Sequence, residues 1–335
     1  MKVLVTGAAG FIALHVIERL LDRGHQVIGL DNFTPYYELS LKEARVAHLQ
    51  GRSGFRFLRL DLTDRAAVAA LFEAEHFDQV IHLAAQPGVR YSLQEPFAYA
   101  DANLTGHLTV LEGCRHTGVK HLIFASSSSV YGLTRQTPFH TGQRSDHPIS
   151  LYAATKKANE VMSHSYAHLF GLPVTGLRFF TVYGPWGRPD MATFKFTRAI
   201  LAGDPIEVYG HGDMRRDFTY VGDIADSVVA LLDHIPAADP AWTAEAGDPA
   251  ASSAPYRIYN IGNGEPVPLM DFIRTLERLL DRKANLVMKP LQAGDLSETS
   301  SDTAPLAHLL GEAPYTPVEE GLARFVDWYR GFYKV

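Results

Sequence analysis

The sequence predicts an α/β protein, with a doubly wound parallel sheet and a smaller C-terminal α+β lobe. In the first half of the chain, short aliphatic or β-branched runs alternate with segments of helical periodicity, and this rhythm becomes irregular after about residue 184. Such alternation is typical of βαβ units, in which right-handed crossovers place helices on both faces of the sheet. Ligands are then expected at the carboxyl ends of the strands.

The expected elements follow one another along the chain in this order. In the first half we expect strands over Val3–Thr6, Val27–Leu30, Phe55–Leu60, Val80–Ala84, His121–Ala125 and Val174–Phe180. Helices are expected over Phe11–Arg23, Ala66–Glu75, Ala102–Thr117 and Tyr152–Phe170. In the second half, short strands and helices are expected over Ile206–Tyr209, Arg257–Ile261, Leu286–Met288, Phe194–Ala202 and Leu269–Leu280.

Composition narrows the class of protein. The chain has 335 residues, 46% of them hydrophobic, and a net charge of -6 without a long basic run, so nucleic acid is not an expected partner. Its one cysteine, Cys114, cannot form an internal disulfide, and no run of eighteen apolar residues suggests a membrane span. The 15 histidines show no metal-binding spacing. We therefore expect a cytoplasmic protein without a metal.

A glycine turn lies between the first strand and the first helix. Gly7 is placed to make the tight turn, and Gly10 lets the backbone approach a pyrophosphate at the helix N-terminus. The third position of this motif is Ala13, whose methyl group tightens the helix against the strand. This arrangement is typical of a Rossmann dinucleotide site.

An acidic residue follows the second strand, where a dinucleotide site requires one. Asp31 would accept hydrogen bonds from the adenosine ribose and repel a 2′-phosphate, which favours NAD over NADP. Asp31 could instead be a turn or helix-cap residue. Asp61, which ends the third strand, could face the adenine, and residues 82–86 (HLAAQ) could line the dinucleotide.

Tyr152 and Lys156 are four residues apart on an expected helix, so both side chains lie on one face. An ammonium near a phenol lowers the pKa of the phenol by stabilising the phenolate, which would make Tyr152 a general base. Taken alone, the pair is equally compatible with a solvated helix face. However, four serines, 126–129, gather at the end of the fifth strand, and no G-x-S-x-G hydrolase motif is present.

Together these motifs resemble the extended short-chain dehydrogenase/reductase family. The resemblance rests on the glycine turn, Asp31, SSSSVYG, Tyr152-x-x-x-Lys156, RFFTVYGPWGRPD, RRDFTYVGDI, DNFTPYYELSLKEAR and AAQPGVRYSL. Within the family the chain is similar to NAD-dependent nucleotide-sugar epimerases, most closely to the UDP-glucuronate 4-epimerase group. The similarity covers nearly the whole chain apart from residues 237–255.

The resemblance implies reversible C4 epimerisation of UDP-glucuronate to UDP-galacturonate through a transient 4-keto sugar, with tightly bound NAD. It makes Tyr152 the acid/base on the sugar 4-hydroxyl, Lys156 its partner, and Ser127 a hydroxyl that shares the proton. The expected cofactor site comprises Tyr152, Lys156 and also Gly7, Gly10, Phe11, Ile12, Asp31, Asn32, Asp61, Leu62, Leu83, Ala84, Ala85, Gln86 and Asn103.

The resemblance also implies a substrate site. Ser128, Ser129, Thr181 and Arg188 are expected around the substrate carboxylate, and an arginine fork suits such a group. Arg216 is expected on the diphosphate, although it could instead pair with Asp217 at the rim. The remaining expected substrate residues are Arg90, Val208, Tyr209, Asp295 and Lys195, the last of which could also be an ordinary exposed lysine.

Other members of the same family are the alternatives, namely a UDP-galactose 4-epimerase or a UDP-glucuronate decarboxylase. Decarboxylases carry a glutamate where this chain has Ser129, and galactose epimerases usually carry asparagine in place of Thr181. A non-catalytic NAD-binding regulator is disfavoured by the intact triad of Ser127, Tyr152 and Lys156.

Domain organisation and assembly complete the expectations. We expect an NAD-binding Rossmann domain over residues 1–183, to which segments at about 212–235 and 257–264 return. Residues 184–335 mainly form the nucleotide-sugar-binding lobe, with a surface insertion at about 237–255, which is rich in Ala, Pro, Gly and Ser. The resemblance further implies a homodimer joined through the helices at 102–117 and 152–170.

Overall fold

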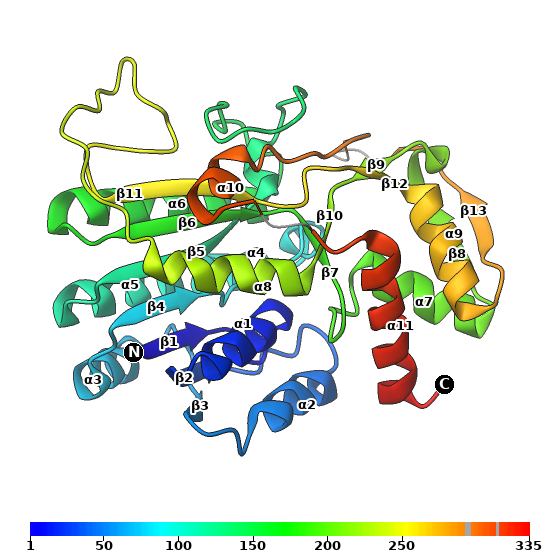
Figure 1. The fold of residues 1–335 in the computed structure, drawn as a ribbon, viewed down its shortest axis with the longest axis horizontal. Coiled ribbons are helices and arrows are strands. Elements are labelled where there is room, and N and C mark those ends of the chain that lie inside the picture. The colour runs from blue at the N-terminus through cyan, green and yellow to red at the C-terminus, as the bar shows by residue number, and fades with distance from the viewer. Residues whose placement is uncertain (292–295, 313–314) are drawn as a thin grey trace.

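A computed structural model describes residues 1–291, 296–312 and 315–335. In this part of the chain a central sheet of seven parallel strands has the order β11-β6-β5-β4-β1-β2-β3 (Figure 1). The strands are β1 (Lys2–Thr6), β2 (Gln26–Asp31), β3 (Phe55–Arg59), β4 (Gln79–His82), β5 (His121–Ser127), β6 (Val174–Phe179) and β11 (Tyr256–Ile261). The predicted fold class, a doubly wound parallel sheet, is confirmed.

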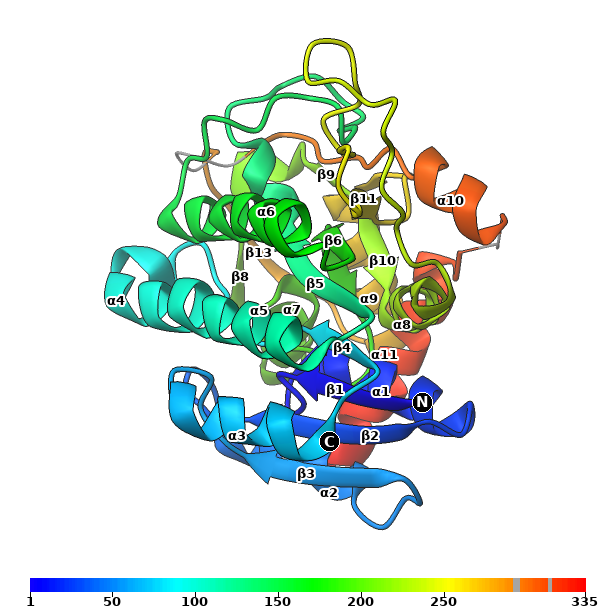
Figure 2. The same cartoon turned by 90° about the vertical axis from the view of Figure 1, so that its left-hand side faces the viewer.

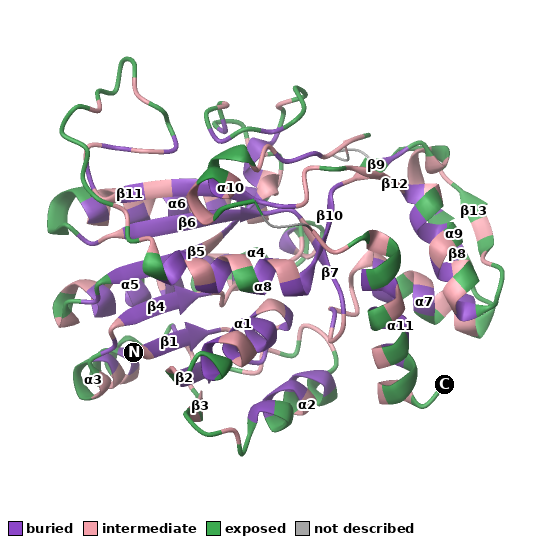
Figure 3. Cartoon of the chain, viewed as in Figure 1, coloured by how far each residue is buried: buried purple, intermediate pink, exposed green. Residues whose placement is uncertain are grey.

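Helices cover both faces of this sheet (Figure 2). On one face lie α3 (Arg65–Glu75), α5 (Gly106–Thr117) and α6 (Leu151–Phe170), and on the other lie α1 (Phe11–Asp22) and α8 (Val221–Ala230). The central strands are buried almost throughout (Figure 3). Burial on both faces explains why these strands read as continuous apolar runs rather than as alternating patterns.

The second lobe lies beside the sheet in Figure 1. Its helices are α7 (Ala192–Ala202), α9 (Leu269–Leu280) and α11 (Val318–Tyr333), and β8 (Pro205–Val208) pairs in parallel with β13 (Asn285–Met288). Shorter elements are β7 (Thr181–Tyr183) with β10 (Phe218–Tyr220), β9 (Arg215–Arg216) with β12 (Val267–Pro268), and α10 (Ala304–Leu310). Single turns are η1 (Tyr91–Leu93), α4 (Pro96–Tyr99), η3 (Ser128–Tyr131), η4 (Tyr209–Gly212) and η5 (Leu231–Asp233).

Two elements differ from the sequence expectation. Helix α2 (Leu39–Leu49) was not anticipated, because Lys42 and Arg45 occupy positions on its buried face and break the apolar pattern. The helix expected over 102–117 begins instead as a π-helix, η2 (Ala100–Thr105), which then continues into α5. Strand β11, which lies in the segment expected to return from the second half of the chain, extends the central sheet by pairing with β6.

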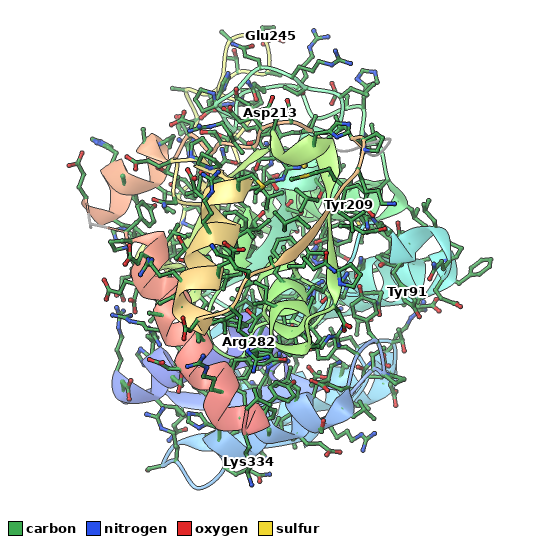
Figure 4. All side chains as sticks on the ribbon, turned by 90° about the vertical axis from the view of Figure 1, so that its right-hand side faces the viewer. Tyr91, Tyr209, Asp213, Glu245, Arg282 and Lys334 are labelled. Atoms are coloured by element: carbon green, nitrogen blue, oxygen red, sulfur yellow. The ribbon has the colours of Figure 1, made fainter. Side chains whose placement is uncertain are left out.

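The insertion at 237–255 carries no helix or strand of its own. Its tip around Glu245 projects away from the body of the molecule (Figure 4), while Ala250, Ser252 and Ala254 are buried. His164 on α6 lies 2.8 Å from the hydroxyl of Ser252. The end of the insertion is therefore anchored beside α6 rather than lying wholly on the surface.

The order of strands in the sheet positions the site. The connections leave β1 and β4, which are neighbours, in opposite directions, and ligands of such sheets bind at this switch point outside the carboxyl ends of the strands. Within the described residues, none of the helices combines the length and the apolar character needed to cross a membrane.

Candidate active site

A cavity of about 990 Å³ opens at the carboxyl ends of the strands, between the sheet and the second lobe. It is lined from the sheet side by the glycine turn and the ends of β2, β4 and β5, and from the other side by α7 and β8. Tyr91 and Tyr209, which come from the two sides, both lie toward the same face of the molecule in Figure 4. Most of the predicted site residues line this one cavity.

The glycine turn requires glycine at its first position. Gly7 has a φ of +73°, and a Cβ there would lie 2.8 Å from the backbone nitrogen of Ala84. Gly10 donates to the carbonyl of Gly7 at 2.7 Å and caps the N-terminus of α1. The turn thus presents bare backbone at a helix N-terminus inside the cavity, which fits a dinucleotide pyrophosphate.

The acids after β2 and β3 are held in fixed orientations. Asp31 accepts hydrogen bonds from the backbone N–H groups of Ala9 (3.1 Å) and Phe33 (2.8 Å). Asp61 accepts from the amide of Asn32 at 2.7 Å and from Thr63. Burial opposes the charged form of Asp61, but these hydrogen bonds outweigh it and hold its pKa below the usual value.

A residue of the π-helix η2, Asn103, supports the segment that follows β4. Leu83, Ala84, Ala85 and Gln86 line the cavity, as predicted for a dinucleotide wall, together with Phe11, Ile12 and Leu62. Asn103 does not line it: its side chain accepts from the backbone N–H of Gln86 at 2.8 Å and donates to Thr155 at 3.0 Å. Asn103 therefore acts on the cavity wall through Gln86 rather than as a direct contact.

The serines of 126–129 end β5 at the cavity, and the first of them is fixed from behind. The hydroxyl of Ser126 donates to Glu160 at 2.7 Å, and Glu160 accepts from Arg178 at 2.8 and 2.9 Å. Glu160 and Arg178 are both almost completely buried. This ion pair ties α6, β5 and β6 together directly behind the predicted catalytic residues.

Tyr152 and Lys156 lie on one face of α6, which begins at an N-cap where Ser150 accepts from the backbone of Ala153. Both line the cavity. The ammonium of Lys156 donates to the carbonyl of Ala125 at 2.8 Å, which fixes α6 against the end of β5. Ser127, Tyr152 and Lys156 are thus brought together in the part of the cavity where β5 ends.

The pKa of Tyr152 differs from the expectation. Burial raises it above the usual value of 10, and the opposing influences are a hydrogen bond from Ser127 and the positive charge of Arg188. Lys156 is not among them, and burial lowers the pKa of Lys156 itself from 10.5 to about 7. The expected lowering of the Tyr152 pKa by Lys156 is therefore wrong for this structure, in which burial has the largest influence.

The low pKa of Lys156 predicts how the stability of the folded protein changes with pH. Between about pH 7 and 10.5 the unfolded chain holds a proton on Lys156 that the folded chain has released. The free energy of unfolding, relative to that of Lys156→Met, should therefore fall as the pH falls through this window, by at most about 1.4 kcal/mol per pH unit, and then level off. Urea unfolding at several pH values measures it.

The matched control for this prediction is Lys120→Met, which changes an exposed lysine. Its difference from the wild-type protein should vary much less between pH 7 and 10. If the Lys156→Met and wild-type curves run parallel across the window, the ammonium of Lys156 is not destabilised by burial.

Arg188 lies close to this centre and is held by an acid two residues away. Its Nε and one terminal nitrogen donate to the two carboxylate oxygens of Asp190, at 3.0 and 2.5 Å. Burial disfavours the charged guanidinium, but Asp190 outweighs burial and raises its pKa. Arg188 lines the cavity together with Ser128, Ser129 and Thr181, so the predicted carboxylate-binding set is assembled in one place.

The second lobe contributes some of the predicted substrate residues and not others. Lys195 and Tyr209 line the cavity, and the guanidinium of Arg90 lies 5.5 Å from the centre of the Tyr209 ring. Val208 is fully buried in the core because alternate residues of β8 face opposite sides. Arg216 lies on β9, is not among the residues that line the cavity, and donates to the carbonyls of Arg215 and Ser297. Asp295 falls outside the described residues.

Sequence reasoning missed several cavity residues. Tyr36, Lys42, Tyr91 and Asp190 all line the cavity, and none was assigned a role. All four lie in motifs that carried the resemblance, so their presence there was the available signal. No cluster of His, Cys, Asp and Glu that could bind a metal occurs among residues 1–291, 296–312 and 315–335.

The glycine turn, the fixed acids and the paired Tyr152 and Lys156 define a dinucleotide-dependent enzyme of the Tyr–Lys type. A family model described as the NAD dependent epimerase/dehydratase family matches residues 3–262. The chain belongs to this family, and its cofactor is NAD, as predicted.

Relatives over the full length support this assignment. The chain is 59% identical over 335 residues to an uncharacterized 37.6 kDa protein in the cld 5′ region of Escherichia coli O111:H-, with 100% of both chains covered. It is 50% identical over 336 residues to a probable UDP-glucuronate 4-epimerase of Rhizobium meliloti (strain 1021), covering 100% of this chain and 98% of that protein.

A solved structure is also similar. The crystal structure of UDP-glucuronic acid 4-epimerase from Bacillus cereus, in complex with UDP-glucuronic acid and NAD, superposes with a TM-score of 0.87 at 32% sequence identity. The match covers 99% of this chain and 100% of that one.

Proposed function

We propose that the protein interconverts UDP-glucuronate and UDP-galacturonate by epimerisation at C4. The observation that carries this proposal is the joining of two sets of residues in one cavity, the acid/base set of Ser127, Tyr152 and Lys156 and the carboxylate-binding set around Arg188. Relatives and a structural neighbour named as UDP-glucuronate 4-epimerases support it.

The acid/base set manages one proton. NAD supplies the group that takes up and returns a hydride at C4 of the sugar. Tyr152 removes the proton of the 4-hydroxyl, and the Ser127 hydroxyl donates to the phenolate so formed, which favours it. The resulting 4-keto sugar turns over in the cavity, and Tyr152 then returns the proton.

The carboxylate-binding set protects the intermediate. A uronic acid oxidised at C4 is a β-keto acid, which loses carbon dioxide readily when the bond to its carboxylate stands perpendicular to the carbonyl plane. Donors from Ser128, Ser129, Thr181 and Arg188 would hold this bond near the plane and suppress the loss. No carboxylate stands at position 129 to catalyse chemistry at C5.

The rest of the nucleotide would lie toward the second lobe. Lys195 on α7 supplies positive charge for the diphosphate, and Tyr209 with Arg90 flanks the uridine end of the cavity. In an acidic protein such local cations concentrate the attraction for an anionic ligand where it is needed.

The test is a product assay by NMR. Purified protein with NAD and UDP-glucuronate should give UDP-galacturonate, and the reverse reaction should reach the same equilibrium mixture. UDP-xylose with released carbon dioxide would instead identify a decarboxylase. Conversion of UDP-galactose to UDP-glucose without any reaction of UDP-glucuronate would identify a galactose epimerase.

We also propose that the protein is a homodimer, joined through α5 and α6, which lie side by side in Figure 2. The two helices expose apolar side chains, including Leu108 (37% exposed), Val161 (59%) and Leu169 (68%). A surface of this kind is typical of an interface. Val161→Glu should give a monomer in sedimentation velocity, whereas the control Ile235→Glu should stay dimeric; a monomeric wild-type protein would contradict the proposal.

We further propose a cytoplasmic location. The one cysteine of the sequence, Cys114, is buried, and burial raises the pKa of its thiol, so it is neither reactive nor available for a disulfide. A protein without disulfides is typical of a reducing compartment. Cell fractionation with an antibody against the protein tests this location.

A further inference from the structure

The motif DNFTPYYELSLKEAR begins at the last residue of β2. Only its first two residues, Asp31 and Asn32, belong to the expected cofactor site. Its later part, from Phe33 through α2, packs against the loop of residues 185–190 that ends at Asp190. The two segments are separated by about 150 residues in the chain and contain no common element. The hydrogen bonds between them come from Tyr36 and Arg45.

Arg45 is fully buried, and its guanidinium binds backbone carbonyls rather than an acid. It donates to the carbonyl of Ala9 in the glycine turn at 2.9 Å, to the carbonyl of Trp186 at 2.7 and 3.2 Å, and to that of Gly187. No carboxylate in the described part of the chain pairs with it. A buried cation is costly unless its N–H groups are hydrogen-bonded. Losing any of these carbonyls would therefore destabilise the guanidinium, so the hydrogen bonds hold the carbonyls in place.

The backbone held by Arg45 is strained just before Arg188. Trp186 has a φ of +63°, which a bulky non-glycine residue rarely adopts. Such a conformation persists only where the surroundings impose it, and the two hydrogen bonds from Arg45 to the Trp186 carbonyl do so. Arg45 therefore fixes the chain two residues before Arg188 and ties it to the glycine turn.

The guanidinium of Arg188 is fixed from the same segment. The Tyr36 hydroxyl donates to one oxygen of Asp190 at 3.1 Å, and Asp190 occupies two nitrogens of Arg188. Gly88 makes room for this hydroxyl, because a Cβ on Gly88 would lie 2.4 Å from it. These two hydrogen bonds to Asp190 use the Nε and one terminal nitrogen of Arg188, and the other terminal nitrogen lies outside this pair.

We propose that Tyr36, Asp190 and Arg45 are positioning residues that direct the edge of the Arg188 guanidinium not bound by Asp190 toward the carboxylate of the substrate. The proposal rests on the function proposed above and adds residues that it does not assign. Tyr36 and Asp190 orient the guanidinium, and Arg45 fixes the backbone that carries it. The motif after β2 thus serves both ligands, the dinucleotide through Asp31 and the uronate through Arg188.

A misaimed Arg188 has a specific chemical consequence. When the carboxylate of the 4-keto sugar turns out of the carbonyl plane, the C5–C6 bond breaks, carbon dioxide leaves, and the electron pair forms an enolate between C5 and C4. A proton then adds at C5. The products are carbon dioxide and a UDP-4-keto-pentose, and the hydride taken from C4 stays on the nicotinamide dinucleotide as one equivalent of its reduced form.

The experiment compares two variants that keep every charge. Tyr36→Phe removes only the hydroxyl, and Asp190→Glu keeps the carboxylate but moves it by one methylene. We expect Asp190→Glu to lower the affinity for UDP-glucuronate, relative to UDP-glucose, by about tenfold, because it disturbs the charge-assisted hydrogen bonds between Asp190 and Arg188. Tyr36→Phe should lower the same relative affinity only several-fold, because it removes one hydrogen bond to Asp190 and leaves the ion pair in place. Calorimetry with the NAD-loaded protein measures both affinities.

Both variants should also release more carbon dioxide and reduced dinucleotide per epimerisation than the wild-type protein, with Asp190→Glu ahead of Tyr36→Phe. The matched controls are Tyr166→Phe and Asp226→Glu, which change a tyrosine and an aspartate outside the cavity. The controls should keep the wild-type affinity ratio and product ratio. UDP alone should bind all five proteins equally, because Arg188 does not act on the nucleotide.

Arg45→Lys tests whether Arg45 fixes the backbone before Arg188. The variant keeps the positive charge but loses the planar guanidinium that binds several carbonyls at once. It should shift the product ratio in the same direction, and a folded Arg45→Lys protein with the wild-type ratio would remove Arg45 from the proposal. If Arg45→Lys does not fold, Tyr37→Phe, which removes only the hydroxyl that accepts from Arg45 at 2.6 Å, decides the same point.

The outcomes separate this proposal from the proposed function. A wild-type protein that leaves UDP-glucuronate unchanged would refute the function. A wild-type protein that epimerises UDP-glucuronate, with Tyr36→Phe and Asp190→Glu indistinguishable from their controls, would refute only the positioning role. Equal losses of affinity for UDP-glucuronate, UDP-glucose and UDP would also overturn it, because they would show a general disturbance of the cavity.

Discussion

Tyr152→Phe is expected to lower kcat for epimerisation by about a thousandfold, because the ring remains and only the hydroxyl that exchanges the O4 proton is lost. The Tyr152 side chain faces the cavity beside Ser127 and Lys156, and its ring contacts Tyr99 edge to face. The packing of α6 should therefore survive the change. Initial rates from UDP-glucuronate, with product separation, measure the loss.

The binding steps should be preserved in Tyr152→Phe. NAD content and the dissociation constant of UDP-galacturonate should stay within a few-fold of the wild-type values, since a single neutral hydrogen bond contributes little to either. Tyr333→Phe, on α11 and outside the cavity, is the control and should leave kcat unchanged. Full activity in Tyr152→Phe would mean that another group moves the proton.

Gly7→Ala is expected to abolish tight NAD binding and to destabilise the fold. At a φ of +73° a side chain costs about 1–2 kcal/mol from the backbone conformation alone. The new Cβ would also lie 2.8 Å from the nitrogen and 2.9 Å from the Cα of Ala84, so β1 and the end of β4 must separate. These two segments form the wall against which the pyrophosphate is expected to lie.

The matched control is Gly24→Ala, which has nearly the same φ, +74°, but has no atom within 4 Å of the added Cβ. It measures the backbone cost without the collision. In urea unfolding Gly7→Ala should lose more stability than Gly24→Ala, and in NAD titration only Gly7→Ala should lose affinity. Equal behaviour of the two variants would show that the close approach to Ala84 does not shape the cofactor site.

The parts of the site that depend on local spacing could be predicted from the sequence. A strand, a glycine turn and a helix placed Gly7, and a separation of four residues placed Tyr152 and Lys156 on one helix face. These relations are set within a few residues of chain, so the sequence displays them directly. The fold class was predictable for the same reason, because alternation of strands and helices is itself local.

The parts that depend on burial could not be predicted in this way. Val208 was expected beside the uridine and is in the core, and Arg216 was expected on the diphosphate and is not among the residues that line the cavity. Helix α2 was missed because its interior positions are filled by Lys42 and Arg45, which a hydrophobic pattern counts as exposed. Arg45 is buried because a distant segment, residues 186–187, supplies carbonyl partners for its guanidinium.

The sequence by itself determined the α/β class, the family, NAD as the cofactor and most of the groups proposed for the site. Only the tertiary structure decided the pKa values of those groups and the direction in which their side chains are held. Burial, rather than Lys156, dominates the pKa of Tyr152, and Tyr36 reaches Asp190 across 154 residues of chain. The physical reason is that spacing along the chain fixes which side chains share a face, whereas desolvation and long-range hydrogen bonds arise only once separate segments pack together.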